Sequence, residues 1–304
     1  MSDQLTKAMQ RKPILLSLVG FAVLVAVGIV GFFMTEEQGH ELSPVITERM
    51  VRYSFTLENH SNQALEQTEF KVFAPVSQTP FQKVERIEAS LPYQLETDAL
   101  GNQTLVFSIQ QFPPFGQKSI SISVWLKLAD RAAYDSPLTP ESFLTPIVPG
   151  SAGYLVEAVS QMENASGPLQ RLGSANRWVH ENLEDVGYVA EDRGAEYALR
   201  ELKGDCTEFA QALIAIARSE DMPALMVAGF PAQAGNSILQ ASDYHNWVMA
   251  NANNQWRVAD PHAGVFDNDA DRYIAFRLFQ NQSGDALNSQ RFFSYDPRIR
   301  VQMN

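Results

Sequence analysis

One apolar helix and the residues at its start organise this chain. The apolar positions recur at the spacing of a single helix face: Ala210, Leu213, Ile214 and Ala217. Asp205 is a favourable N-cap residue, and Gly204 can break the incoming chain at no steric cost. The sequence therefore predicts a helix that begins next to Asp205, runs to Ile216 and carries Cys206 on its first turn.

Cys206 is the only cysteine in this chain of 304 residues. It cannot form an internal disulfide, so it is either a small buried residue of a core helix or a reactive thiol. Unpaired backbone N–H groups and the helix dipole favour a thiolate on the first turn of a helix. The position of Cys206 on the first helical turn favours a reactive thiol. The helix alone does not exclude that Cys206 is a buried packing residue.

Strands are expected after this helix, over residues 224–230, 244–249 and 255–261. The second of them carries His245 and the third ends on Asp260. Asn253-Asn254 lies near the middle of the interval and is typical of a turn, so a hairpin would bring the imidazole and the carboxylate side by side. A thiol nucleophile needs this arrangement, because the imidazole takes its proton and the carboxylate orients the imidazole.

The segments that carry these residues also resemble a known family. They are Gly-Asp-Cys-Thr-Glu-Phe-Ala, Met-Pro-Ala, Gly-Phe, His-Asn-Trp-Val and Trp-Arg-Val-Ala-Asp-Pro, in this order over roughly residues 165–265. Together they resemble the core of the transglutaminase-like superfamily, a papain-like α+β fold with helices followed by an antiparallel sheet. The resemblance implies that Cys206 is the nucleophile, His245 the base and Asp260 the orienting carboxylate. Phe209 stands where many relatives carry a polar residue, a departure that concerns the substrate cleft more than the triad.

Residues 14–34 form an uncharged apolar run. At ~1.5 Å rise per residue it spans about 31 Å, enough to cross a bilayer core. Three basic residues precede it within residues 1–13, and Glu36 and Glu37 follow it, so the positive-inside rule places the N-terminal tail in the cytoplasm. A cleavable signal peptide is the alternative, but no small-x-small site follows the run. We expect a single-pass helix in the inner membrane of a bacterium, with the rest of the chain periplasmic or extracellular.

Residues 45–130 have the pattern of β-structure. Apolar and polar residues alternate over 51–57, 105–109 and 120–126, and turn sequences separate these runs. About six strands and no helix are expected, which suggests an antiparallel sandwich of immunoglobulin-like type. Similar β modules precede the core in many transglutaminase-like proteins. The module is a spacer, a wall of the cleft or a substrate-docking unit.

Four prolines within residues 131–150 predict a stiff linker between this module and a second domain at 151–304. In that domain the pattern predicts helices over 154–162, 169–183 and 195–202, with a polar loop over 184–194 that can rim the cleft. The tail from residue 273 is expected to add an edge strand and a final wrap.

Several further residues could take part in chemistry, and the sequence indicates a role for each. His180 lacks the second histidine of a zinc motif and is expected to be structural. His262 competes with His245, which is preferred because it precedes Trp247 on the strand expected to face the cysteine. The backbone N–H of Cys206 is the best candidate donor to an oxyanion. Several relatives use an aromatic side chain as the second donor, so Tyr188 and Trp178 are candidates, with core packing as the alternative.

Composition excludes some classes of function. The formal net charge of −12 argues against nucleic-acid binding. The acidic stretch 267–271 lacks the glycine and glutamate of a calcium loop and is expected to be a solvated loop. The sequence shows no cluster of ligand residues that would indicate an electron-transfer or metal protein, so neither a cofactor nor a metal is expected. The oligomeric state stays open.

The resemblance implies an enzyme that transfers acyl groups from amide bonds of a protein or peptide substrate, through a thioester on Cys206. Water as acceptor gives a peptidase or amidase, and a lysine amine gives a protein-glutamine transamidase. The alternative is a non-catalytic, membrane-anchored module that binds a peptide or protein of the cell envelope. The two differ in the thiol, since catalysis predicts a cysteine that ionises below the ~8.5 of a free thiol.

Overall fold

The computed structural model describes residues 43–162, 164–189, 191–232, 235, 237–280, 292–294 and 296–304. The segment Pro44–Asn304 forms one compact unit. The expected membrane-spanning helix at 14–34 and the tail at 1–13 lie outside the described residues. Within the described residues, no helix is long and apolar enough to span a bilayer.

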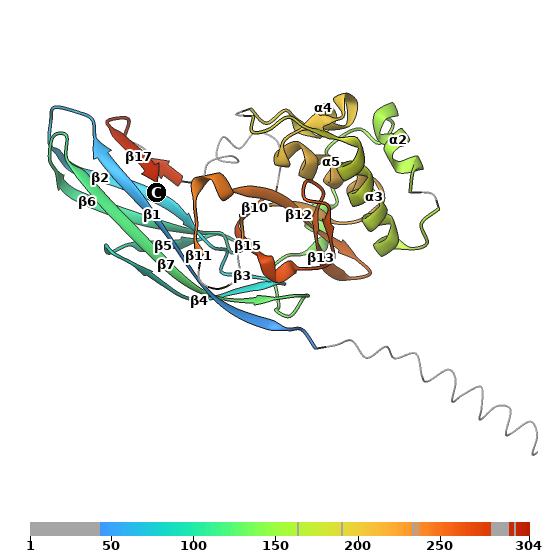
Figure 1. The fold of residues 1–304 in the computed structure, drawn as a ribbon, viewed down its shortest axis with the longest axis horizontal. Helices are drawn as coiled ribbons and strands as arrows, with labels where there is room; N and C mark the ends of the chain where they lie inside the picture. Colours follow the sequence, from blue (N-terminus) through green and yellow to red (C-terminus); the bar gives the residue numbers. More distant parts are fainter. Residues whose placement is uncertain are drawn as a thin grey trace, which may run out of the picture. The chain divides into compact units, whose positions relative to one another are not determined.

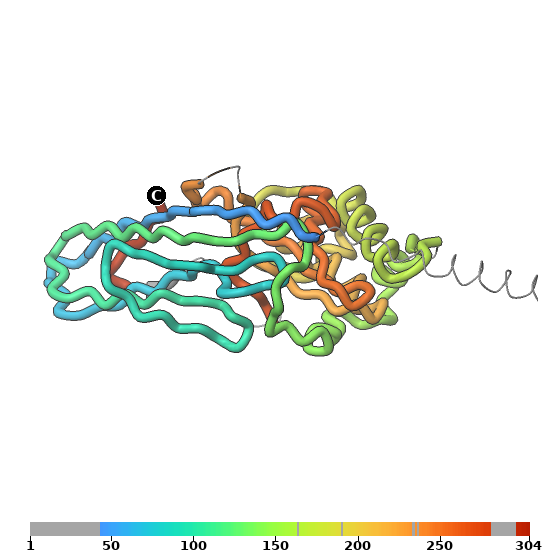
Figure 2. Tube along the Cα trace, turned by 90° about the horizontal axis from the view of Figure 1, so that it is seen from below, coloured from blue at the N-terminus to red at the C-terminus, as the bar shows by residue number. Residues whose placement is uncertain are grey.

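The first part of the chain folds into strands, as the alternating pattern predicts. They are β1 (Ile46–Asn59), β2 (Leu65–Ala74), β3 (Gln78–Thr79), β4 (Gln82–Ala89), β5 (Gln94–Thr97), β6 (Gln103–Phe112) and β7 (Gln117–Ala129). One sheet has the order β11-β1-β7-β4-β3, where β11 is Ser237–Ile238, and β17 (Ile299–Met303) also pairs with β1. Another sheet has the order β16-β2-β6-β5, where β16 is Phe292–Ser294. The long antiparallel pair of β1 and β7 runs side by side in Figure 2. The immunoglobulin-like type of this β part stays a prediction.

Burial follows the predicted period of two. On β1, the residues expected to face the core are all buried: Val51, Tyr53, Phe55 and Leu57. Two strands from much later in the chain also join these sheets: β11 (Ser237–Ile238) pairs with β1, and β16 (Phe292–Ser294) pairs with β2. The sheets are therefore completed by residues that no local pattern connects to them.

The second part combines helices with an antiparallel sheet. Its helices are α2 (Gly153–Ser160), α3 (Pro168–Asn182), α4 (Gly194–Glu201) and α5 (Cys206–Ser219). Its sheet has the order β14-β13-β12-β10-β15, built from Val265–Phe266, Gln255–Asp260, His245–Ala252, Ala224–Pro231 and Tyr273–Leu278. Helix α5 packs against β10 and β12 (Figure 1). It extends three residues beyond the predicted end, and the apolar face read from the sequence is buried.

The two parts share core and hydrogen bonds. Phe230 and Phe276 of the second sheet pack among the aromatic residues of the β part. The side-chain amide of Gln82 donates to the backbone oxygen of Ala275 and accepts from its nitrogen, at 3.0 and 2.9 Å. In the proline-rich segment, Phe143 is buried and packs edge-on against Trp256. The division into domains at 131–150 stays a prediction.

Candidate active site

The start of α5 is fixed by a capping box. Asp205 is the N-cap, and its Oδ1 accepts the backbone N–H of Thr207 at 2.8 Å. Glu208 reaches back and accepts the N–H of Asp205 at 2.9 Å. Cys206 is the first residue of the helix and is half-buried, as the N-cap pattern predicts. The thiol therefore lies where free backbone N–H groups and the helix dipole stabilise negative charge.

Gly204 serves this helix start for a different reason than the expected one. Its backbone needs no left-handed conformation; instead, an added Cβ would lie 2.2 Å from Cβ of Glu208. The glycine lets the capping glutamate fold back across the chain. The D-x-x-E spacing of Asp205 and Glu208 is a sequence signal for this box, and it could have identified Glu208 in advance.

The hairpin of β12 and β13 brings His245 and Asp260 together, as predicted. Asn253 and Asn254 both adopt positive φ, 55° and 60°, which suits a tight turn between two antiparallel strands. Nε2 of His245 lies 2.7 Å from Oδ2 of Asp260. The carboxylate is fully buried, and the imidazole side chain is 14% exposed.

Cys206 also lies close enough to His245 to act on the pKa of the imidazole. Burial lowers the pKa of His245, but the hydrogen bonds and charges of Asp260 and Cys206 outweigh it and raise the pKa to about 10. The ring is therefore an imidazolium at neutral pH. The structure brings together the three residues that the sequence selected.

Asp260 is held by more than the histidine. Burial raises its pKa, but hydrogen bonds from His245, the N–H of Ala263 at 3.0 Å and the hydroxyl of Tyr273 at 2.9 Å lower it below its usual value. Burial also raises the pKa of Tyr273, so this phenol keeps its proton and donates it. Tyr273 was not among the predicted site residues, because nothing in its own strand marks a hydroxyl that contacts a carboxylate on another strand.

We expect Tyr273→Phe to reduce the activity of the site about tenfold, because one of the hydrogen bonds that hold the carboxylate is lost. The loss raises the pKa of Asp260, so the acidic limb of the pH–rate profile should move to higher pH. Tyr134→Phe, which removes a hydroxyl remote from the site, serves as the control. An unchanged acidic limb in Tyr273→Phe would contradict a role for this hydroxyl in setting the pKa of Asp260.

The other two histidines of this region have separate partners. Nε2 of His262 lies 3.2 Å from Oδ2 of Asp185, and its ring centroid is 5.5 Å from that of His245. It also meets the ring of Phe209 edge-on, and Phe209 is buried. Nδ1 of His180 donates to the backbone oxygen of Pro261 at 2.9 Å. His245 is thus the histidine on Asp260, and His180 supports the turn after it.

The remaining candidates lie as follows. Trp178 packs, half-buried, against the helical core, whereas Tyr188 is 83% exposed. In the acidic stretch, both oxygens of Asp267 lie 3.0 Å from Nη1 of Arg257, and Asp269 pairs with Arg272. In the part of the chain that the structure describes, no group of three acidic, histidine or cysteine side chains is placed to hold a metal ion.

The site therefore consists of a cysteine at a helix N-terminus beside an antiparallel sheet that carries the histidine and the carboxylate. Residues 157–261 match the family model of the transglutaminase-like superfamily, and this segment contains all three residues. The sequence matches no curated protein. Residues 157–261 are therefore similar to a transglutaminase-like core, as the sequence resemblance implied.

Two solved structures are similar. A proposed cysteine protease from Cytophaga hutchinsonii has a TM-score of 0.53 at 13% identity, covering 86% of this chain and 92% of that one. The periplasmic domain of TgpA from Pseudomonas aeruginosa has a TM-score of 0.37 at 15% identity, covering 70% and 88%. At this identity the first likeness shows a shared fold.

Proposed function

We propose that this protein is a membrane-anchored, extracytoplasmic enzyme that transfers acyl groups from amide bonds of a protein or peptide, with Cys206 as nucleophile. The observation that carries the proposal is the position of His245, whose Nε2 lies 2.7 Å from the buried Asp260 and whose pKa is raised by Asp260 and Cys206. This geometry supports a cysteine nucleophile next to an imidazolium.

The chemistry follows from the proton on His245. The thiolate of Cys206 attacks the carbonyl carbon, and the negative charge that develops on oxygen is stabilised by the N–H of Cys206 at the start of α5. The tetrahedral species collapses, the C–N bond breaks, and the imidazolium gives its proton to the leaving amine. A thioester and a neutral imidazole remain. The imidazole then takes a proton from water, or from an amine, as that acceptor attacks the thioester and releases the thiolate.

The acceptor decides the net reaction. Water yields a peptidase or amidase, and a lysine amine yields a cross-link between proteins. We favour hydrolysis, because water is abundant outside the membrane. Incubation of the protein with casein and a dansylated alkylamine separates the two, since transamidation makes casein fluorescent and hydrolysis releases new amino termini.

The location of the enzyme rests on residues 14–34 and on the basic tail before them. An uncharged run of this length, with the basic residues on its N-terminal side, supports a single crossing of the inner membrane with the catalytic part outside. The β part, of immunoglobulin-like type in this proposal, then lies between the anchor and the transglutaminase-like core in the sequence.

Alkylation of the single cysteine tests the proposal. With iodoacetamide between pH 5 and 9, Cys206 should already react at full rate well below the ~8.5 of a free thiol. His245→Ala should lose this reactivity at pH 6 by about two orders of magnitude, because the thiolate loses its positive partner. His60→Ala, which removes a histidine paired with Glu58 of β1, is the matched control. A rate that rises only near pH 8.5 in wild type and variant alike would favour the non-catalytic binding module.

A further inference from the structure

The segment between β8 (Glu184–Asp185) and α4 is held at two points beside the reactive pair. On the histidine side, Asp185 bonds His262, whose ring lies 5.5 Å from that of His245. On the cysteine side, the N–H of Val189 donates to Oδ2 of Asp205 at 3.0 Å, and Asp205 immediately precedes the nucleophile. The residues between these points are therefore tied, through His262 and Asp205, to neighbours of both members of the pair.

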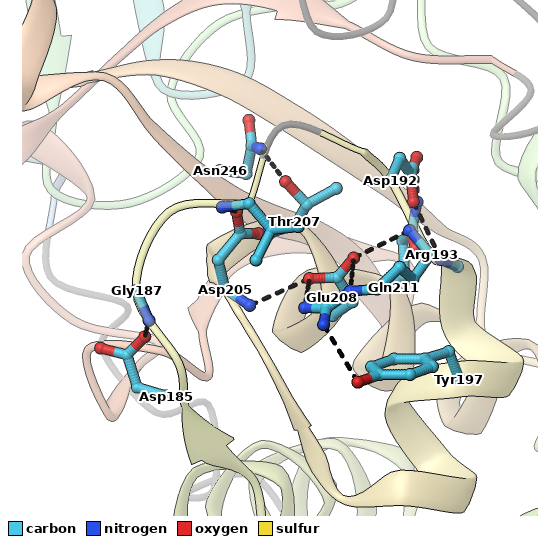
Figure 3. A network of polar contacts seen from close by, with 12 residues as sticks. Asp185, Gly187, Asp192, Arg193, Tyr197, Asp205, Thr207, Glu208, Gln211 and Asn246 are labelled. Atoms are coloured by element: carbon cyan, nitrogen blue, oxygen red, sulfur yellow. Dashed lines mark hydrogen bonds and ion pairs between the residues drawn. The ribbon is translucent and has the colours of Figure 1, made fainter.

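Further hydrogen bonds fix the backbone of this segment. The N–H of Val186 donates to the oxygen of Gly204 at 3.1 Å, next to the N-cap of α5. The N–H of Gly187 donates to Oδ1 of Asp185 at 2.8 Å (Figure 3). Val186 and Val189 are thus bonded to Gly204 and Asp205, the two residues before the cysteine, so the segment presents its side chains from a defined position.

The end of the segment is joined to α5 by a buried carboxylate. Glu208 accepts from the backbone N–H and the guanidinium of Arg193, and its side chain is 1% exposed. One turn further along the helix, Gln211 donates to Oδ2 of Asp192 at 2.8 Å. Figure 3 shows these side chains directed toward one another at the start of α5. The segment is therefore fixed to the helix that carries the thiol.

Tyr188 stands out on this fixed segment. It is 83% exposed although the residues on both sides of it are hydrogen-bonded, and Val186 beside it is 42% exposed. Single exposed apolar residues are ordinary on a protein surface. An aromatic ring on a fixed backbone beside a nucleophile is different, because it offers large contact area at little cost in ordering.

We propose that Tyr188 is a specificity-determining residue that packs against an apolar side chain of the peptide substrate, next to the amide that is attacked. The inference rests on the proposed function and adds a substrate class to it. The exposed carboxylates of Glu184 and Glu191 on the same segment disfavour an acidic side chain at this position. The ring, not the hydroxyl, makes the contact.

Affinity-labelling rates test this without a known substrate. The probes are iodoacetamide, N-acetyl-Phe-Gly chloromethyl ketone and N-acetyl-Gly-Gly chloromethyl ketone, each reacted with the full chain. The wild type should prefer the Phe-Gly over the Gly-Gly probe, and Tyr188→Ala should lower that ratio on the order of tenfold. Tyr188→Phe should keep the ratio, and the iodoacetamide rate should be the same in all three proteins. Phe115→Ala, which removes another exposed aromatic ring, is the matched control.

The outcomes separate the inference from the function on which it rests. An unchanged ratio in Tyr188→Ala overturns the contact, and an equal loss in Tyr188→Phe overturns it in favour of a role for the hydroxyl. A wild-type thiol that reacts with iodoacetamide no faster than a free cysteine overturns the proposed enzyme, whatever the ratio shows.

Discussion

Asp260→Asn is expected to lower amide cleavage by about 10³- to 10⁴-fold while the protein stays folded. The variant keeps the shape of the side chain and one oxygen, which can accept either from Ala263, as Oδ1 of Asp260 does, or from Tyr273, as Oδ2 does. It removes the negative charge that faces His245. Burial lowers the pKa of His245, and the bond to Asp260 is the largest effect that raises it. Without that charge the pKa falls well below about 10, and the ring is neutral at pH 7.

A neutral ring changes two measurable properties. It no longer stabilises the thiolate of Cys206, so rapid alkylation at pH 6 should disappear, and it has no proton to give to a leaving amine. Single-turnover cleavage of casein and the iodoacetamide profile report these losses separately. Asp267→Asn is the matched control, because its carboxylate pairs with Arg257 away from the thiol and should leave both rates unchanged. Full activity in Asp260→Asn would contradict an electrostatic role for the carboxylate and leave Asp260 as a packing residue only.

The central residues of this site were predictable because local signals mark each of them. Asp205 is an N-cap directly before Cys206, so the thiol falls on a first helical turn. Asn253 and Asn254 both accept positive φ, so the turn and the pairing of the strands around it follow from the sequence. The hairpin register pairs Val248 with Ala259, so His245 and Asp260 come near each other diagonally across the two strands.

The supporting residues were not predictable in the same way. Tyr273 reaches Asp260 from β15, a strand at the far edge of the sheet, and the pairing of β15 with β10 has no local signature. The bond of Gln82 to Ala275 joins residues 193 positions apart. The parallel pairing of β8 with β9 (Lys203–Gly204), which positions the segment around Tyr188, joins only two residues on each strand. Contacts of this kind depend on how whole helices and strands pack against one another, and the periodicity of the sequence does not predict them.

Glu208→Ala is expected to destabilise the protein by about 3 kcal/mol, the largest effect on stability that the site suggests. The carboxylate is 1% exposed and accepts from the N–H of Asp205, the N–H of Arg193 and the guanidinium of Arg193. Alanine leaves these donors without their acceptor at the start of α5. The guanidinium is 24% exposed and can turn to water, which keeps the cost below that of a fully buried pair.

Urea unfolding at pH 7 measures the loss of stability in Glu208→Ala, and two further variants serve as controls. Glu196→Ala removes a carboxylate from the exposed pair with Arg200, whose side chains are 59% and 55% exposed, and should leave the unfolding midpoint nearly unchanged. Glu208→Gln keeps oxygen for two of the donors and should fall between the two alanine variants. The same carboxylate holds the segment that carries Tyr188, so amide exchange at 186–189 should speed up in Glu208→Ala before global unfolding is detectable. Equal midpoints for Glu208→Ala and Glu196→Ala would show that the capping box and the pair with Arg193 add nothing to stability.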